Sequence, residues 1–224
     1  MQDATLAPDR SFSLGEEIAH SVTHGVGVVL SIAGLAVLVA FASLHGTARD
    51  VVGAAVFGTS LVLLYTASTL YHSIPIARAR PILRVIDHSS IYLLIAGTYT
   101  PIGLRKLPAV TGWWLLAVLW TAALAGIVLT ATLRERFRAA SMVLYVGMGW
   151  SALLVAGPLA RAMGGAGMAL IVAGGVAYTI GIAFYALRQM PYHHLVWHLC
   201  VIAGSVLHYF AVLLYVIPRP VAAG

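Results

Sequence analysis

The sequence predicts an all-α integral membrane protein with seven transmembrane helices. Of its 224 residues, 61% are hydrophobic and only 9% are charged, whereas a soluble globular domain carries about 25% charged residues. The apolar residues form long runs, each long enough to cross a hydrocarbon core of roughly 30 Å. A β-barrel would instead show alternating strands of about ten residues. Helices are expected because a helix satisfies its backbone hydrogen bonds internally in lipid.

The predicted spans are separated by short connections that contain glycine, proline or charged residues, as expected for turns between helices. In chain order the spans are Ile18 to Leu44, Val51 to Ile74, Val85 to Leu104, Trp113 to Leu133, Ala140 to Leu159, Gly167 to Leu187 and Tyr192 to Ile217. The connections are His45 to Thr47, Ser73 to Pro81, Lys106 to Pro108, Arg134 to Arg138, Gly164 to Gly165 and Gln189 to Pro191. Residues 18–217 are therefore expected to form one membrane domain between a polar N-terminal tail, residues 1–17, and a C-terminal tail, residues 218–224.

The net charge of +6 does not indicate nucleic-acid binding, because the basic residues are scattered through the connections rather than gathered on one face. They indicate the orientation of the chain instead. If the N-terminus lies inside, the cytoplasmic side holds Arg10, Arg78, Arg80, Arg84, Arg134, Arg136, Arg138 and Arg188, and the other side holds Arg49, Arg105, Lys106, Arg161 and Arg219. The positive-inside rule then predicts a cytoplasmic N-terminus and an external C-terminus.

Ionisable residues within the predicted spans gather at one depth, near the cytoplasmic face. Such a residue costs about 2.5 to 3.5 kcal/mol on insertion scales, so each one requires a partner or a function. His72 lies near the end of the second span, and Asp87 lies at the start of the third. His194 and His198 open the seventh span and lie four residues apart, so both can point to one place on the same helix face.

Three neutral imidazoles, from His72, His194 and His198, match the ligands of a catalytic zinc site that keeps a fourth position for water. Iron held by two histidines and a carboxylate is the competing interpretation, and three histidines favour Zn²⁺. Asp87 has two candidate roles: it could deprotonate a water at the metal or orient a ligand imidazole. Ser68, one turn from His72, could hydrogen-bond the same water or a substrate carbonyl. Cys200 is the only cysteine, which excludes a thiolate-cluster metal site.

Each of these residues also has a simpler structural explanation. The paired histidines could bond to neighbouring helices, Asp87 could cap the third helix, and Ser68 could bond to its own backbone. The shared depth of the four polar positions favours the metal site over these alternatives. Glu17, His20 and His24 lie on one face of the first span. Because zinc already has enough ligands, these three are expected to support the site structurally rather than bind the ion.

Four segments resemble, in order and spacing, the motifs of the hemolysin III proteins, the bacterial branch of the progestin and adipoQ receptor family. They are Glu17 to Gly25, Ser68 to His72, Asp87 to Tyr92 and His194 to His198. The resemblance covers essentially the whole chain. It implies seven helices around an intramembrane zinc bound by the three histidines, with Asp87 beside the metal-bound water and Ser68 nearby. The hormone-receptor members have a long polar N-terminal region where this chain has about 17 residues, so a hormone-receptor role is not expected.

The resemblance also implies membership of a wider superfamily that contains alkaline ceramidases, and a role in membrane-lipid homeostasis. The leading hypothesis is therefore a zinc-dependent hydrolase in the cell membrane, the bacterial inner membrane, that cleaves an amide or ester of a lipid-like substrate entering from the bilayer. One alternative is a membrane-state sensor or receptor with a structural zinc. The other is a pore-forming cytolysin, which is disfavoured because the polar residues gather at one depth instead of lining a path through the bilayer.

Overall fold

The computed structural model describes residues 12–217, and within this range the chain is entirely helical apart from short turns. The seven α-helices are α1 (Leu14–His45), α2 (Ala48–Ser73), α3 (Arg80–Arg105), α4 (Ala109–Leu133), α5 (Arg138–Gly149), α6 (Ala156–Ala186) and α7 (His193–Ala211). Short 3-10 segments, η1 (Arg134–Phe137) and η2 (Trp150–Val155), flank α5, and a π-helical segment, η3 (Val212–Val216), follows α7. The predicted all-α class is confirmed. Most of the expected tails, including Arg10 and Arg219, lies outside the described residues.

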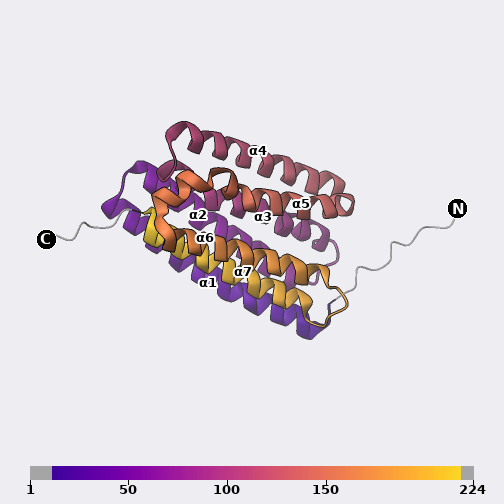
Figure 1. Cartoon of the computed structure of the whole chain (residues 1–224). Coiled ribbons are helices and arrows are strands. Elements are labelled where there is room, and N and C mark those ends of the chain that lie inside the picture. The colour runs from indigo at the N-terminus through magenta and orange to yellow at the C-terminus, as the bar shows by residue number, and fades with distance from the viewer. Residues whose placement is uncertain (1–11, 218–224) are drawn as a thin grey trace.

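The helices lie side by side along one common direction (Figure 1). α1 packs on α2, α2 on α3 and α3 on α4, while α6 packs on α7 and α7 returns to α1. The short connections make α1 to α4 alternate in direction, and α7 runs opposite to the part of α6 that follows Gly164. As a result, the first turns of α1, α3 and α7 meet the last turn of α2 at one end of the bundle. This is the end where the sequence places the cluster of ionisable residues.

The bundle has the surface of a protein surrounded by lipid. Four stretches are long and apolar enough to cross a membrane by length and composition: Leu14–His45, Ala48–Ser73, Ala109–Ala186 and His193–Val216. The third of them spans 78 residues and contains α4, α5 and α6. Many large apolar side chains on these helices face outward, among them Val29, Leu124 and Leu154. A soluble monomer rarely exposes so much contiguous apolar surface, so the chain is a multi-pass helical membrane protein.

The first helix begins at Leu14 rather than at the expected Ile18. Ser13 caps it: the backbone N–H of Glu16 donates to Ser13 Oγ at 3.3 Å, and the Ser13 N–H donates to Glu16 Oε2 at 2.9 Å. This reciprocal pair is a capping box, which satisfies two backbone donors at a helix start. The other oxygen of Glu16 accepts from the backbone N–H of Tyr192 at 3.2 Å. The cap therefore places Glu17 on the helix and holds the start of α7 beside it.

The region predicted as the fifth span, residues 140–159, is less regular than expected. α5 has 12 residues and passes through η2 into α6. The predicted connection at Gly164 to Gly165 is a kink inside α6, where Gly164 has φ 68° and ψ 175°. Glycine adopts a positive φ without steric cost because it has no Cβ. The helical direction is thus interrupted at the predicted place, and the helical segment before it combines α5, η2 and the first part of α6.

Candidate metal centre

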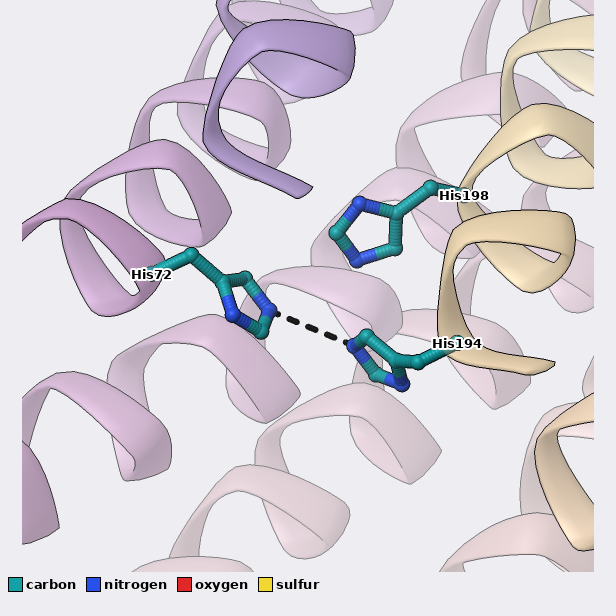
Figure 2. A group of neighbouring side chains, drawn as sticks. All are labelled: His72, His194 and His198. Carbon is teal, nitrogen blue, oxygen red and sulfur yellow. Dashed lines mark hydrogen bonds between the residues drawn. The ribbon is translucent and has the colours of Figure 1, made fainter. Parts of the chain in front are cut away.

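Three histidines from two helices meet inside the bundle. His72 lies in the last turn of α2, whereas His194 and His198 lie in the first two turns of α7. One ring nitrogen from each of them lies within 4.8 Å of the others. The three side chains point toward one another across the gap between the two helices (Figure 2). Their exposed fractions are 5%, 7% and 1%, so bulk water has little access to them. This buried group could hold a metal ion.

The spacing and chemistry of these donors fit a metal ion. Nε2 of His194 and Nε2 of His72 are 3.2 Å apart. Two nitrogens bound to one zinc in tetrahedral geometry, at bond lengths of about 2.0 to 2.1 Å, would be separated by about 3.3 Å. Neutral imidazoles suit zinc, copper, iron and nickel, whereas magnesium and calcium prefer oxygen ligands. The donor set would therefore suit an ion of the first kind.

A carboxylate from α1 fixes the orientation of His72. Nδ1 of His72 donates to Glu17 Oε2 at 2.7 Å, and Arg80 at the start of α3 donates to the other carboxylate oxygen. Because an ionised carboxylate only accepts hydrogen bonds, the proton of His72 resides on Nδ1, and the lone pair of Nε2 faces the other histidines. Carboxylates that orient ligand imidazoles in this way are common in metal sites. The imidazole of His72 is thus oriented by Glu17.

Replacing Glu17 with glutamine is expected to weaken metal affinity about 10- to 100-fold, the usual effect of losing a partner of a metal ligand. Glutamine keeps the size of the side chain but loses the charge that holds His72 and Arg80. Competition between the purified protein and a chelator of known affinity measures the change. Glu16→Gln is the matched control and should bind metal normally, because Glu16 contacts Ser13 and Tyr192 rather than a histidine. Unaltered affinity in Glu17→Gln would contradict the orienting role.

His20 and His24 lie against the three histidines rather than at a distance from them. His20 is completely buried, and the centroid of its ring is 4.7 Å from that of His72, 4.8 Å from His194 and 5.2 Å from His198. His24, one turn further along α1, stacks on His198 with a centroid distance of 3.6 Å. The ring nitrogens of His20 and His24 have no hydrogen-bond partner among the described residues. Glu17, His20 and His72 form a second set whose ligand atoms lie within 4.8 Å of one another.

Asp87 and Ser68 form a separate pair beside the cluster. Ser68 is buried one turn before His72, and its hydroxyl interacts with the carboxyl group of Asp87 on α3. Among residues 12–217, neither set of three potential ligands includes Asp87. The structure thus brings Asp87 and Ser68 together without making Asp87 part of a ligand set. Their roles at a water or a substrate carbonyl stay predictions.

Two contacts at the centre involve residues that the sequence did not single out. Arg80, which the sequence indicated only as a determinant of orientation, forms the ion pair with Glu17. The Phe12 ring lies 4.7 Å from that of His20 and 5.1 Å from that of His194, so it covers the cluster from outside the first helix. No sequence pattern reveals either contact, because Arg80 is 63 residues from Glu17 and a single aromatic residue before a helix is common.

An apolar cavity begins close to the Asp87 and Ser68 pair. Its volume is about 80 Å³, and its lining comes mainly from α3, α5, α6 and α7. Ile91 lies one turn after Asp87, Leu64 lies one turn before Ser68, and Trp197 is adjacent to His198. Small-molecule sites in proteins commonly enclose about 300 to 1,000 Å³ with mostly apolar walls. The cavity is smaller than such sites and forms a narrow apolar space next to Asp87, Ser68 and His198.

Comparison with known proteins identifies relatives along almost the full described length. The family model described as Haemolysin-III related matches residues 12–209, which include every residue of the metal centre. The chain is 44% identical over 209 residues to the Hemolysin-3 homolog of Bacillus subtilis (strain 168), covering 93% of this chain and 98% of the relative. It is 45% identical over 203 residues to Hemolysin-3 of Bacillus cereus, covering 91% of this chain and 93% of that relative. It is 26% identical over 217 residues to the human protein named Monocyte to macrophage differentiation factor, covering 92% of this chain and 86% of that relative.

Proposed function

The chain belongs to the Haemolysin-III-related family of membrane proteins, and from that premise we propose that it is a zinc-dependent hydrolase that cleaves an amide or ester bond of a membrane lipid. The main support for the proposal is the buried group of His72, His194 and His198, in which one ring nitrogen of each residue lies within 4.8 Å of the others. Zinc is the proposed ion because three imidazoles and no carboxylate make up the group, as in catalytic zinc sites. When bound, zinc polarises a carbonyl oxygen and makes water nucleophilic near neutral pH.

The side chains around the histidines have the chemistry that hydrolysis requires. Asp87 would accept a proton from water as it attacks the carbonyl carbon, and would return it to the leaving amine or alcohol. The hydroxyl of Ser68 would hold the carboxyl group of Asp87 in position. Glu17 would keep Nε2 of His72 directed toward the ion. These four side chains come from α1, α2 and α3, and α7 supplies the remaining histidines.

The proposed substrate is a lipid that enters from the bilayer and leaves part of its hydrocarbon in the apolar cavity. Leu64, Ile91 and Trp197 would place that hydrocarbon within one helical turn of Ser68, Asp87 and His198. The proposed topology has seven crossings, with the N-terminus in the cytoplasm. The centre would then lie in the inner leaflet, since it shares one end of the bundle with Arg80, Arg138 and Arg188.

A second candidate is a membrane-state sensor in which the metal has only a structural role. It is favoured by the position of α1, which packs on both α2 and α7. An ion bound by His72, His194 and His198 would join α2 to α7 across α1 and would oppose their separation. In that case metal removal would alter the arrangement of the helices, and Asp87 would be dispensable for any chemistry.

The proposed activity can be tested without knowing the substrate. Membranes from cells that produce the wild-type chain should contain less of one class of lipid amide or ester, and more of its products, than membranes from cells that produce His194→Ala. His193→Ala is the matched control, because His193 is a neighbouring histidine outside both sets of potential ligands. Its lipid profile should equal that of the wild type. Identical profiles for the wild type and His194→Ala at equal protein levels would contradict hydrolysis.

A further inference from the structure

Two sets of potential metal ligands overlap at His72. One is the group formed by His72, His194 and His198, here called the triad, and the other is formed by Glu17, His20 and His72, here called the outer set. Because one histidine belongs to both, the two sets adjoin each other, and an ion that leaves one set is close to the ligands of the other. The triad is too buried to exchange ions with water directly, as its members are at most 7% exposed.

The outer set lies on the side of the triad that is closer to water. Glu17 is in the first turn of α1, and its side chain is 13% exposed, whereas that of His72 is 0% exposed. His20 follows one turn deeper and contacts all three histidines of the triad. The carboxylate oxygen Glu17 Oε2 lies 3.9 Å from Nδ1 of His20 and 2.7 Å from Nδ1 of His72. Glu17 and His20 therefore lie between the start of α1 and the triad.

Charge neutralisation makes the outer set a low-affinity site for a metal ion. Arg80 forms an ion pair with Glu17, so the negative charge that would attract a dication is neutralised. A metal ion there would also compete with the hydrogen bond between Glu17 and His72. His20, in contrast, buries an imidazole without a hydrogen-bond partner among the described residues, which costs about 1 to 3 kcal/mol. The imidazole of His20 would therefore gain a favourable interaction when a metal ion binds next to it.

From these observations we infer that Glu17 and His20, together with His72, form a transfer site through which the metal ion enters and leaves the triad. The inference rests on the proposed metal centre. The ion moves as a dication from lone pairs of Glu17 and His20 to Nε2 of His72 and the ring nitrogens of His194 and His198, while Nδ1 of His72 keeps its proton. No redox change and no covalent bond to the protein other than metal–ligand bonds is involved.

A transfer site has a kinetic signature that a permanent ligand lacks. It lowers the activation free energy for movement of the ion between water and the triad. Loss of the transfer site therefore slows metal uptake and metal release by the same factor. The equilibrium affinity then stays constant. Loss of a permanent ligand instead speeds release and weakens affinity. The two roles of His20 are therefore distinguished by comparing both rates with the dissociation constant.

The experiment uses purified full-length protein, stripped of metal with a chelator and mixed with Co²⁺ in a stopped-flow spectrometer. His20→Ala should take up and release Co²⁺ at least about tenfold more slowly than the wild type, which corresponds to about 1.4 kcal/mol in the barrier. The final content of about one ion per chain and the dissociation constant should not change. His45→Ala is the matched control, because His45 lies on the same helix at the opposite end. If His20→Ala does not fold, His20→Asn is measured in its place.

Each outcome decides between the alternatives. Wild-type rates in a folded His20 variant would overturn the transfer role while leaving the triad in place. Faster release and weaker affinity in the variant would also overturn it, since His20 would then be a permanent ligand. A wild-type chain that binds no Co²⁺ or Zn²⁺ would remove the triad as a metal site and the transfer site with it. Failure of the proposed lipid hydrolysis would not affect any of these measurements.

Discussion

Replacing both His194 and His198 with alanine is expected to reduce the metal content from about one ion per chain to none. The two histidines supply two of the three imidazoles of the triad, and only His72 remains in the variant. Structural zinc sites in small peptides bind with about 10 to 16 kcal/mol, and most of this free energy is lost when a single ligand is left. Metal analysis of protein purified without added chelator, by mass spectrometry of the bound elements, provides the measurement.

The control for this experiment combines two histidines that lie outside the triad. His45 is at the far end of α1, and His193 immediately precedes His194. Their double replacement with alanine removes the same number of imidazoles and should leave the metal content unchanged. Full metal retention in the variant that lacks His194 and His198 would exclude the proposed site, whatever else the protein does.

Replacing Asp87 with asparagine is expected to leave the chain folded and loaded with metal but to reduce lipid turnover by about 10²- to 10⁴-fold, the usual contribution of a general acid or base. Asparagine has the size of aspartate and can still interact with Ser68, but it cannot accept a proton. The metal should remain because Asp87 belongs to neither set of potential ligands in residues 12–217. The comparison requires the lipid identified by the membrane profiles and a metal determination on the same sample.

Asp50→Asn is the appropriate control for Asp87→Asn. Asp50 is a carboxylate in the first turn of α2 at the opposite end, where its Oδ1 is 3.3 Å from the Arg105 guanidinium. Turnover per folded molecule should therefore equal that of the wild type. Normal turnover in Asp87→Asn would favour the sensor hypothesis, and loss of the metal would instead identify Asp87 as a ligand.

The sequence predicts the helical class and the depth of the polar cluster because both depend on local patterns. Apolar runs separated by glycine, proline and charged residues indicate helices that cross a membrane. The alternating direction of short-connected helices then places His72, Asp87 and His194 at one end, as observed. The spacing of four between His194 and His198 fixes their common helix face.

The contacts that complete the centre depend on packing, which a sequence pattern does not contain. The expected start of the first helix was late by four residues, since the mutual hydrogen bonds of Ser13 and Glu16 extend it. The contact between Glu17 and His72 depends on which helices are neighbours, and α1 lies against α2 in a way that presents Glu17. Arg80 could not be distinguished from the other arginines, because its partner is 63 residues away in the chain.

The separation of the ligands along the chain has a consequence for biosynthesis. His72 and His194 are 122 residues apart, on the second helix and the last. A nascent chain that has inserted its first helices therefore carries Glu17, His20 and His72 in the membrane while the other imidazoles have not yet been translated. The triad can be completed only after α7 has been synthesised and has entered the bundle, so its ion binds after translation, whereas the outer set is already complete in the early helices.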